Sequence, residues 1–253
     1  ETGIRNLCLA GGVALNCVAN GRIKRSGSFD NIWIQPAAGD AGGALGAAQA
    51  LAHLYHGLDR TVHQHDNMQG AYLGIQFDNA EIGTALDRLG ARYVQLDSTE
   101  RMIDKAAEAL ADQKVVGWFQ GRMEFGPRAL GGRSILGDAR SPEMQKNLNL
   151  KIKYRESFRP FAPSILAENV HDYFDLNGPS PYMLLVDTVK EGRRLAITRE
   201  QETLFGIEKL NIPRSDIPAV THVDYSARIQ TVHKETNPRY HALISEKKKK
   251  TGC

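Results

Sequence analysis

The sequence predicts a mixed α/β fold organised in two parts. Two strand–turn–helix units occupy residues 1–57, and a polar stretch without hydrophobic period follows at residues 58–70. From residue 71 to 246, amphipathic helices alternate with short strands. The opening units are typical of a parallel or mixed sheet, and the second part is typical of an α+β domain.

The first part consists of two repeated units. Residues 6–10 have the composition of a buried strand that runs into Gly11 and Gly12, and residues 13–25 take on helical spacing. A second strand is predicted at 31–35, and residues 41–55 form an Ala- and Gly-rich helix. These two units are too short to enclose a core alone, so we expect further chain before residue 1.

The second part contains the longer amphipathic patterns. Ser98 or Thr99 is placed to cap one helix, and Ser141 followed by Pro142 indicates the start of another. Residues 247–253 are predicted to be the exposed end of a helix with Gly252 as its cap, in a truncated tail. The other elements that we expect are a helix at 79–89 and strands at 93–96, 114–119, 182–189 and 229–232.

Composition excludes several classes of protein. In 253 residues, 32 Lys and Arg face 29 Asp and Glu, so the net charge of +3 argues against a nucleic-acid binder. Three cysteines are too few for a disulfide framework and lack zinc-site spacing, which favours a reducing, cytoplasmic location. No apolar run approaches the ~20 residues that a membrane span needs, so we expect a soluble globular protein.

The strongest chemical signal lies between residues 117 and 164. Arginines and lysines recur there among glycines and prolines. Guanidinium groups match phosphate oxygens two at a time, and glycines let the backbone approach a ligand. A solvated basic face is the alternative, but the rigid apolar neighbours of Arg159 favour a pocket for a phosphorylated small molecule.

Weaker signals lie nearer the amino terminus. Gly11 and Gly12 at a strand-to-helix turn fit either a phosphate site or a tight connection, and Asn16 is one turn further on. Asp40 precedes a helix, where spacing alone favours an N-cap over a metal ligand. His63 and His65 lie in a polar loop and are best interpreted as surface residues.

Five segments together resemble the NodU/CmcH/TobZ-type O-carbamoyltransferases. The resemblance spans nearly the whole chain. It is carried by Leu-Ala-Gly-Gly-Val-Ala-Leu-Asn (9–16), Pro-Ala-Ala-Gly-Asp-Ala-Gly-Gly (36–43), Phe-Gly-Pro-Arg-Ala-Leu-Gly-Gly-Arg-Ser-Ile-Leu (125–136), Lys-Tyr-Arg-Glu-Ser-Phe-Arg-Pro-Phe-Ala-Pro (153–163) and Ser-Ala-Arg (226–228).

The resemblance implies a two-module enzyme. Residues 1–57 would be the end of an actin-like (ASKHA) Kae1-like transfer domain, residues 58–70 a linker, and residues 71–246 a YrdC-like α/β domain. The YrdC-like module would convert carbamoyl phosphate and Mg-bound ATP into carbamoyladenylate, phosphate and pyrophosphate. The Kae1-like module would transfer the carbamoyl group to a hydroxyl of a small-molecule acceptor with the help of an Fe(II)-type metal.

The resemblance also assigns residues to these steps. Asp40 would be a metal ligand, while the histidine ligands match nothing in this chain, so we expect the chain alone to be inactive in transfer. Gly11, Gly12 and Asn16 would bind carbamoyladenylate, and Arg133 and Arg155 are second-rank candidates in the adenylate-forming module. The residues implied in carbamoyl phosphate and ATP chemistry are Arg128, Lys153, Arg159, Ser226 and Arg228.

One departure and several alternatives remain at this stage. Tyr225 stands before Ser226, where the pattern leads us to expect a small residue. A nucleic-acid-binding module or a role in tRNA threonylcarbamoylation is the alternative function. Scarce, non-interleaved aromatic residues argue against the former and the fused module order against the latter. We expect neither a nucleic-acid nor a membrane partner, and the sequence leaves a homodimer open.

Overall fold

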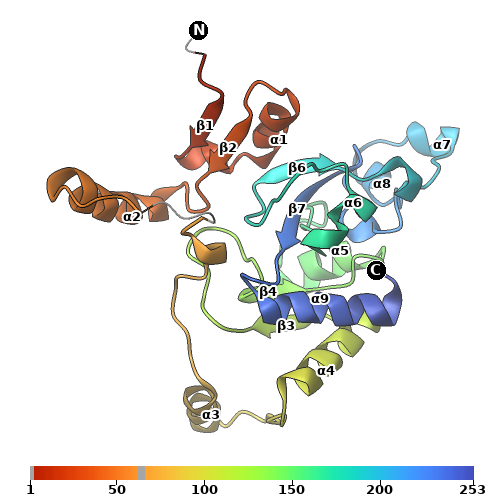
Figure 1. The fold of residues 1–253 in the computed structure, drawn as a ribbon. Helices are drawn as coiled ribbons and strands as arrows, with labels where there is room; N and C mark the ends of the chain where they lie inside the picture. Colours follow the sequence, from red (N-terminus) through yellow and green to blue (C-terminus); the bar gives the residue numbers. More distant parts are fainter. Residues whose placement is uncertain (1–2, 62–65) are drawn as a thin grey trace.

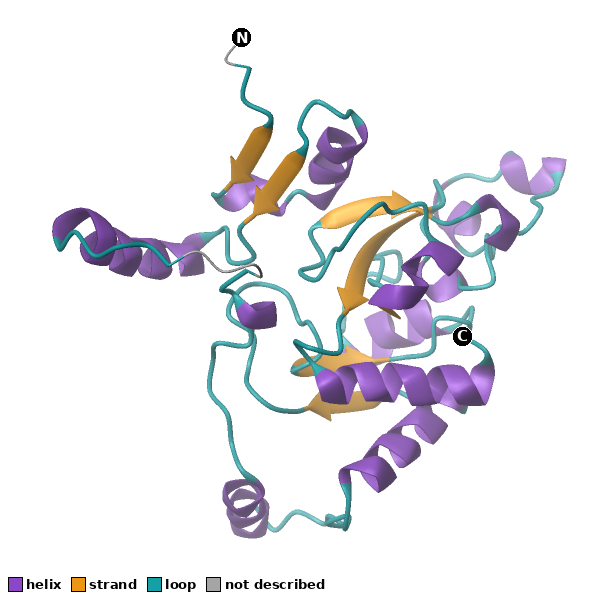
Figure 2. Ribbon diagram, in the orientation of Figure 1, coloured by secondary structure: helices purple, strands orange, loops and turns teal. Residues whose placement is uncertain are grey.

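The structure is a computed structural model that describes residues 3–61 and 66–253, and it has the mixed α/β fold that the sequence predicts. The Kae1-like and YrdC-like identities of its parts remain predictions. Its strands and helices (Figures 1 and 2) are β1 (Asn6–Leu9), α1 (Cys17–Arg25), β2 (Asn31–Ile34), α2 (Asp40–Ala50), α3 (Asn79–Arg88), α4 (Thr99–Ala111), β3 (Val116–Phe119), β4 (Arg133–Leu136), α5 (Met144–Asn147), β5 (Ser164–Leu166), α6 (Val170–Tyr173), β6 (Leu185–Thr188), α7 (Arg199–Glu202), α8 (Gly206–Leu210), β7 (Ser226–Val232) and α9 (Pro238–Thr251). The 3₁₀ and π turns are η1 (Gly12–Leu15), η2 (Leu51–Tyr55), η3 (Gln69–Ala71), η4 (Leu148–Ile152), η5 (Ala167–Asn169), η6 (Glu191–Arg193) and η7 (Pro218–Val220).

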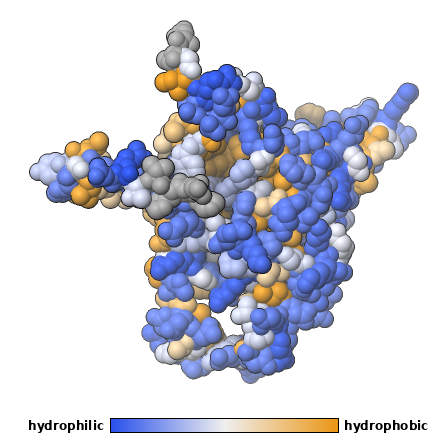
Figure 3. All heavy atoms as spheres, viewed as in Figure 1, coloured by the Kyte–Doolittle hydropathy of each residue, from blue (hydrophilic) through white to orange (hydrophobic). Residues whose placement is uncertain are grey.

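The first part is a small βαβα unit. Strands β1 and β2 pair in parallel, and α1 connects them. The Asn16 side chain caps α1 by accepting a hydrogen bond from the backbone N–H of Ala19 (3.1 Å). Helix α2 extends away from the body of the molecule (Figure 1), and the α2–η2 segment leaves Leu51, Leu54 and Tyr55 as exposed apolar surface (Figure 3).

The second part contains two further sheets. Strands β3 and β4 form an antiparallel pair, and β5, β7 and β6 form a three-stranded sheet with β7 in the centre. Helices α4 and α9 pack on each other and on β3 through Leu110, Trp118 and Leu243. These layers bury Tyr240 and Leu243 of α9, whose last turn is capped by Gly252 in the left-handed conformation (φ 76°), as predicted.

The two parts share one hydrophobic core. Ala14, Ile34 and Ala38 of the first part join the same cluster as Phe174 and Ile229 of the second. Helix α1 packs on β6, which explains why its inward face is buried. The predicted domain boundaries at residues 57, 70 and 246 stay predictions; the shared cluster shows that residues of both parts pack together.

The buried Asn20 side chain reinforces this junction. Its amide donates to the carbonyls of Ala14 (2.8 Å) and Leu184 (3.1 Å). One buried amide therefore ties α1 both to the preceding turn and to the second part.

Several predicted elements were wrong in detail. Residues 93–96 form no strand because no neighbouring strand pairs with them, and Tyr93 and Val94 are exposed. Ser141 does not cap a helix. Its carbonyl accepts from Met144 N (3.2 Å) in a turn, and α5 begins only at Met144. Strands β4 and β5 were not predicted.

The two amino-terminal helices also begin elsewhere than predicted. Residues 13–25 are divided into the 3₁₀ turn η1 and helix α1, since Asn16 interrupts them with a non-helical backbone. Asp40 is not the N-cap of α2: Gly39 occupies that position and Asp40 is the first helical residue. Its carboxylate still lies in the first turn, where the helix dipole favours a negative charge.

The lysines at the end of α9 are less exposed than predicted. Lys247 Nζ lies 3.0 Å from the buried carboxylate of Asp138, and Lys250 Nζ lies 2.6 Å from Asp104. These two lysines therefore fix α9 to the chain around β4 and to α4. No helix in residues 3–61 and 66–253 is long and apolar enough to cross a membrane.

Candidate active site

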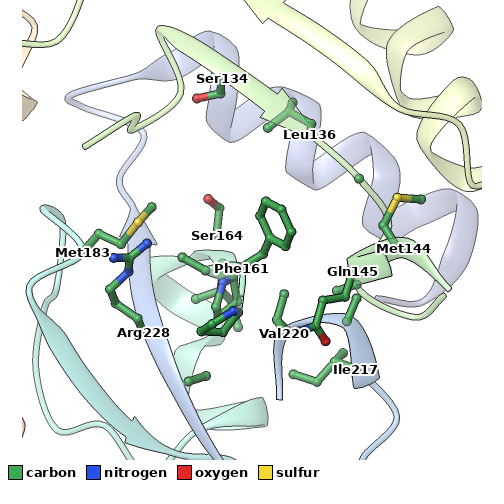
Figure 4. A pocket seen from close by; sticks show the side chains of 18 of the residues that line it. Ser134, Leu136, Met144, Gln145, Phe161, Ser164, Met183, Ile217, Val220 and Arg228 are labelled. Carbon is green, nitrogen blue, oxygen red and sulfur yellow. The ribbon is translucent and has the colours of Figure 1, made fainter. Parts of the chain in front are cut away.

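A cavity of about 800 Å³ lies between the β3–β4 layer and the three-stranded sheet. In Figure 4, Ser134 and Leu136 lie on one side of this cavity, Phe161 and Ser164 in its middle, and Arg228 on another side. The remaining walls come from α1, α5, η7 and α9. This volume falls in the range of small-molecule sites and leaves room for more than one small ligand.

Five basic side chains from three separate segments converge on this cavity. Arg128 comes from the loop before β4, Lys153, Arg155 and Arg159 from the segment after η4, and Arg228 from the central strand β7. The predicted convergence of Arg128, Lys153 and Arg159 is thus observed. No single element could present these groups from several directions.

Arg228 and Arg128 form the inner part of this basic cluster. Burial lowers the pKa of Arg228, and the charges of Arg128 and Arg155 lower it further, while the Cys17 thiol opposes both effects. The Nε atom of Arg128 is buried and has no hydrogen-bond partner in residues 3–61 and 66–253, while its Nη2 donates to the Leu15 carbonyl at 3.3 Å.

These inner arginines have no acidic counterpart. Among the described residues, no carboxylate forms an ion pair with Arg128 or Arg228, and none forms one with the neighbouring outer cation Arg155. Buried like charges without a counter-ion are costly unless an anion binds between them. The arrangement is therefore typical of an anion site.

The outer cations are held more loosely. Arg155 Nε donates to the Asn149 side chain (2.7 Å), and its guanidinium lies 5.1 Å from the centre of the Phe161 ring. Arg159 pairs with Glu156 at 2.8 Å, but both side chains are half exposed. Lys153 is exposed. These side chains can change partner at little cost because exposed ion pairs contribute little stability.

Ser226 lies beside the arginines on β7. Ser226 and Arg228 are two positions apart in the strand, so both project toward the cavity. The Ser226 hydroxyl donates to Asp224 Oδ1 at 2.6 Å. Tyr225 adopts φ 62° between them, a left-handed backbone that favours glycine and explains why a small residue is expected at this position.

Arg133 does not line the cavity. Its guanidinium lies 3.5 Å from the centre of the Phe119 ring and donates to the carbonyls of Gln120, Gly121 and Gly132. It also donates to Ile75 (3.3 Å), so the side chain joins β4 to the preceding loops. The structure thus gives this candidate cofactor-binding residue a set of backbone partners.

The candidate residues of the first part also lie outside the cavity. Gly11, Gly12 and Asn16 are exposed, and the turn η1, which begins at Gly12, lies between Gly11 and the start of α1. The neighbouring Cys17 does line the cavity, so the first turn of α1 contributes to the site although the glycine turn does not.

The predicted metal ligand has no partner ligands nearby. Asp40 is exposed, and among residues 3–61 and 66–253 no three His, Cys, Asp or Glu side chains lie close enough to hold a metal ion. The described residues therefore do not form an iron site by themselves. His63 and His65 lie outside the described residues.

Two features of the site escaped the sequence analysis. Glu124 is buried, and its Oε1 accepts hydrogen bonds from the backbone N–H groups of Leu130 (2.7 Å), Gly132 (2.8 Å) and Arg133 (3.2 Å). This carboxylate closes the loop that carries Arg128. Its position before the Gly-Pro turn was the available signal.

The second missed feature is a histidine–carboxylate pair at the cavity wall. His222 Nδ1 lies 3.3 Å from Asp224 Oδ1, and both residues line the cavity with Ser226. The spacing His-x-Asp-x-Ser was visible in the sequence, but neither residue could be placed without the turn that brings them together.

Two protein-family models match this chain. Residues 107–253 match the model described as carbamoyltransferase C-terminus, and residues 1–49 match the one described as carbamoyltransferase N-terminus. The first range contains every basic residue of the cavity, and the second contains the βαβα unit.

Curated proteins show the same relationship over the full chain. An uncharacterised protein of Synechocystis sp. is 64% identical over 100% of this chain and 41% of its own length. Nodulation protein NolO of Bradyrhizobium diazoefficiens is 40% identical over 99% of this chain and 42% of its own length. Nodulation protein U of Sinorhizobium fredii is 35% identical over 99% of this chain and 38% of its own length. The chain thus spans about two fifths of the length of these relatives.

Proposed function

The chain belongs to the carbamoyltransferase family, and on that premise we propose that its basic cavity converts carbamoyl phosphate and ATP into carbamoyladenylate. The carbamoyl group then passes to a hydroxyl of a small-molecule acceptor. Membership of the family supports carbamoyl transfer in general; the donor, the adenylate and the acceptor class are the proposal.

The observation that carries this proposal is the uncompensated basic cluster. Arg128, Arg155 and Arg228 approach one another without a carboxylate between them. A dianionic carbamoyl phosphate beside a triphosphate would supply the missing negative charge. The electrostatics thus favour phosphorylated ligands over neutral ones.

The chemistry follows from this charge distribution. Arg128 and Arg228 would hold the phosphate of carbamoyl phosphate and offset the charge that develops as the phosphate departs. Lys153 and Arg159, which are both exposed, would bind the polyphosphate of ATP and offset the charge of the departing pyrophosphate. The resulting carbamate would then lie next to the α-phosphorus of ATP because both molecules are bound in the same cavity.

Metal ions enter this scheme in two ways. Magnesium would arrive bound to ATP and shield its phosphates. An iron-type metal would polarise the carbamoyl group for transfer, with Asp40 as one ligand. Since the described residues offer no further ligands near Asp40, that site would need residues beyond those described.

A substitution at the cavity mouth tests the proposal. Lys153→Ala should abolish pyrophosphate release that depends on carbamoyl phosphate, because the triphosphate loses one of the two cations proposed to bind it. Its melting temperature should stay nearly unchanged, since Lys153 is exposed. Arg159→Ala should behave alike, because it breaks only an exposed pair.

Lys105→Ala is the matched control, since Lys105 is an exposed lysine on α4 that does not line the cavity. Full pyrophosphate release in the Lys153 and Arg159 variants would refute the proposal. A large loss of stability in these two variants would instead mark the residues as structural.

A further inference from the structure

The proposed reaction consumes one molecule of water. Joining carbamoyl phosphate and ATP into carbamoyladenylate while releasing both phosphate and pyrophosphate requires carbamoyl phosphate to be hydrolysed to carbamate first. Water is a poor nucleophile at neutral pH, so the site needs a group that removes its proton. This inference therefore rests on the proposed function.

Few cavity-lining groups can accept a proton near neutral pH. Arginine remains protonated, and an ordinary lysine is almost fully protonated at neutral pH. Asp138 is fully buried and engaged by Arg140 and Lys247. Among the described residues that line the cavity, His222 carries the only imidazole.

His222 is held in the orientation that such a base requires. Asp224 is a pure acceptor when ionised, so its contact with His222 Nδ1 (3.3 Å) places the proton of the neutral ring on Nδ1. Nε2 is then left as the acceptor. The backbone N–H of His222 also donates to the Ser226 carbonyl (2.9 Å), which fixes the turn that carries both residues.

Asp224 is kept ionised for this task. Burial alone would raise the pKa of Asp224, but hydrogen bonds from the Ser226 hydroxyl, the Ser226 backbone and His222 outweigh it and lower the pKa below its ordinary value. A carboxylate that remains charged both orients the imidazole and stabilises its protonated form.

The charged groups around the pair are mostly cations. Besides Asp224, the titratable or charged side chains that line the same cavity are Cys17, Arg128, Asp138, Lys153, Arg155, Arg159, Tyr173, Arg228, Tyr240, Lys247, Lys248 and Cys253. This surplus of positive charge would hold a phosphate in the cavity that His222 lines.

We propose that His222 is the general base for the hydrolysis of carbamoyl phosphate, with Asp224 as its positioning residue. His222 Nε2 takes a proton from water while the water oxygen bonds to phosphorus. The bond between phosphorus and the carbamoyl oxygen breaks, which yields hydrogen phosphate and carbamate. Carbamate then attacks the α-phosphorus of ATP, the bond to the β-phosphate breaks, and the departing pyrophosphate takes the proton back from His222.

The central experiment compares two routes to pyrophosphate in the full protein. His222→Ala should release phosphate from carbamoyl phosphate about 100-fold more slowly or worse, in line with the loss of a general base. Supplied with ammonium carbamate and ATP, the variant should still release pyrophosphate as the wild type does, because that route needs no water to be deprotonated.

Two further variants sharpen the result. Added imidazole should restore phosphate release to His222→Ala, which a structural role would not allow. Asp224→Asn should slow phosphate release less than the loss of the base does, since the ring remains but is less well oriented. His171→Ala is the matched control because His171 is an exposed histidine on α6 outside the cavity, and it should behave as the wild type.

The outcomes separate this inference from the function on which it rests. Unchanged phosphate release in His222→Ala overturns the inference alone. Loss of both routes without rescue by imidazole also overturns it and marks His222 as a binding or structural residue. A wild-type protein that releases neither product overturns the proposed function, and the inference with it.

Discussion

Arginines of one sequence segment have three different roles in this molecule. Arg133 is engaged by backbone carbonyls, Arg140 is paired with a buried carboxylate, and Arg128 faces the cavity with a buried, unpartnered Nε. The partners, not the residue type, decide which arginine is available to a ligand. Only the last kind favours an anion site.

The electrostatic repulsion between the inner arginines can be measured with the substitution Arg228→Met. This substitution removes one of three neighbouring cations, so the free energy of unfolding should stay level or rise by about 1 kcal/mol, while inorganic phosphate binding is lost. Urea unfolding and calorimetric titration with phosphate measure the two effects. By contrast, Arg140→Met breaks a pair with a fully buried carboxylate and should cost about 2 kcal/mol.

A decrease in the stability of Arg228→Met comparable to that of Arg140→Met would contradict this view of the cluster. Such a decrease would mean that the guanidinium of Arg228 stabilises the fold and is not reserved for binding an anion.

Asp138 should make the fold sensitive to acid. Burial alone would raise its pKa, but hydrogen bonds from Arg140 and Lys247 outweigh burial and lower the pKa below the ordinary 3.8. The pKa of Asp138 is lower in the folded state than in the unfolded state. The ionised carboxylate therefore contributes its full stabilisation at pH values above the unfolded-state pKa. This contribution is lost as the pH falls through the folded-state pKa. Asp138→Asn should therefore unfold more easily at neutral pH and converge with the wild type in acid.

Urea midpoints measured from about pH 6 to about pH 2 check this expectation. Asp59→Asn is the control, since Asp59 is an exposed carboxylate that forms no ion pair with the described residues, and it should follow the wild type throughout. A constant difference between Asp138→Asn and the wild type at every pH would contradict the assignment.

At the scale of elements, the loop from Gly121 to Arg133 is the main organiser of the site. Gly126 lies against the chain at Pro36 and Ala37, where an added Cβ would approach the Pro36 carbonyl to 3.2 Å. Glu124 closes the loop through three backbone N–H groups. The glycines therefore serve close packing between the two parts, and this packing in turn places Arg128.

Two glycines of this loop offer a matched test. Gly121 and Gly131 both have positive φ (58° and 106°), but a Cβ on Gly121 meets open space, while one on Gly131 would lie 2.3 Å from the Tyr240 ring. Gly121→Ala should cost about 1 to 2 kcal/mol for backbone strain alone. Gly131→Ala should cost about 2 kcal/mol more, because the buried ring must also move.

Chemical denaturation of the two variants provides the comparison. Equal losses of stability would show that Tyr240 yields easily and that the loop is less tightly packed than its contacts indicate.

The elements that the sequence predicted well are those with local signals. Helix α4 has a clear apolar stripe and its Ser98 cap, and Gly252 ends α9 as expected. Strand β4 was missed because its only partner, β3, is fixed by tertiary packing, and β5 is too short to show a period. Residues 93–96 had strand composition but no partner, so composition alone misled.

The same distinction holds for the site. The basic residues could be predicted because they stand in dense motifs, and their convergence followed from the charge of the expected ligand. The sequence could not predict that Arg133 lies outside the cavity while Arg128 lines it. This difference depends on which backbone carbonyls of the loop are available to the Arg133 guanidinium. The pairing of His222 with Asp224 likewise depends on a turn ended by the left-handed Tyr225.

For the whole molecule, the cavity is built by both parts of the chain. Cys17 and Val18 of α1 line it together with β7 and the loop of Arg128, and Arg128 itself bonds to the Leu15 carbonyl (3.3 Å). One core cluster continues across this junction. The proposed adenylate-forming site therefore lies directly against the βαβα unit, and we expect binding in the cavity to depend on the position of α1.

The most direct test of the central claim is product analysis by mass spectrometry after the full protein has been mixed with carbamoyl phosphate and Mg-ATP. We predict carbamoyladenylate, with one phosphate and one pyrophosphate released for each molecule formed, and none of these products when carbamoyl phosphate is omitted. Arg128→Met should form no adenylate because the guanidinium that lines the cavity is lost from the proposed anion site. Formation of ADP in place of pyrophosphate would place the attack at the γ-phosphate and contradict the account.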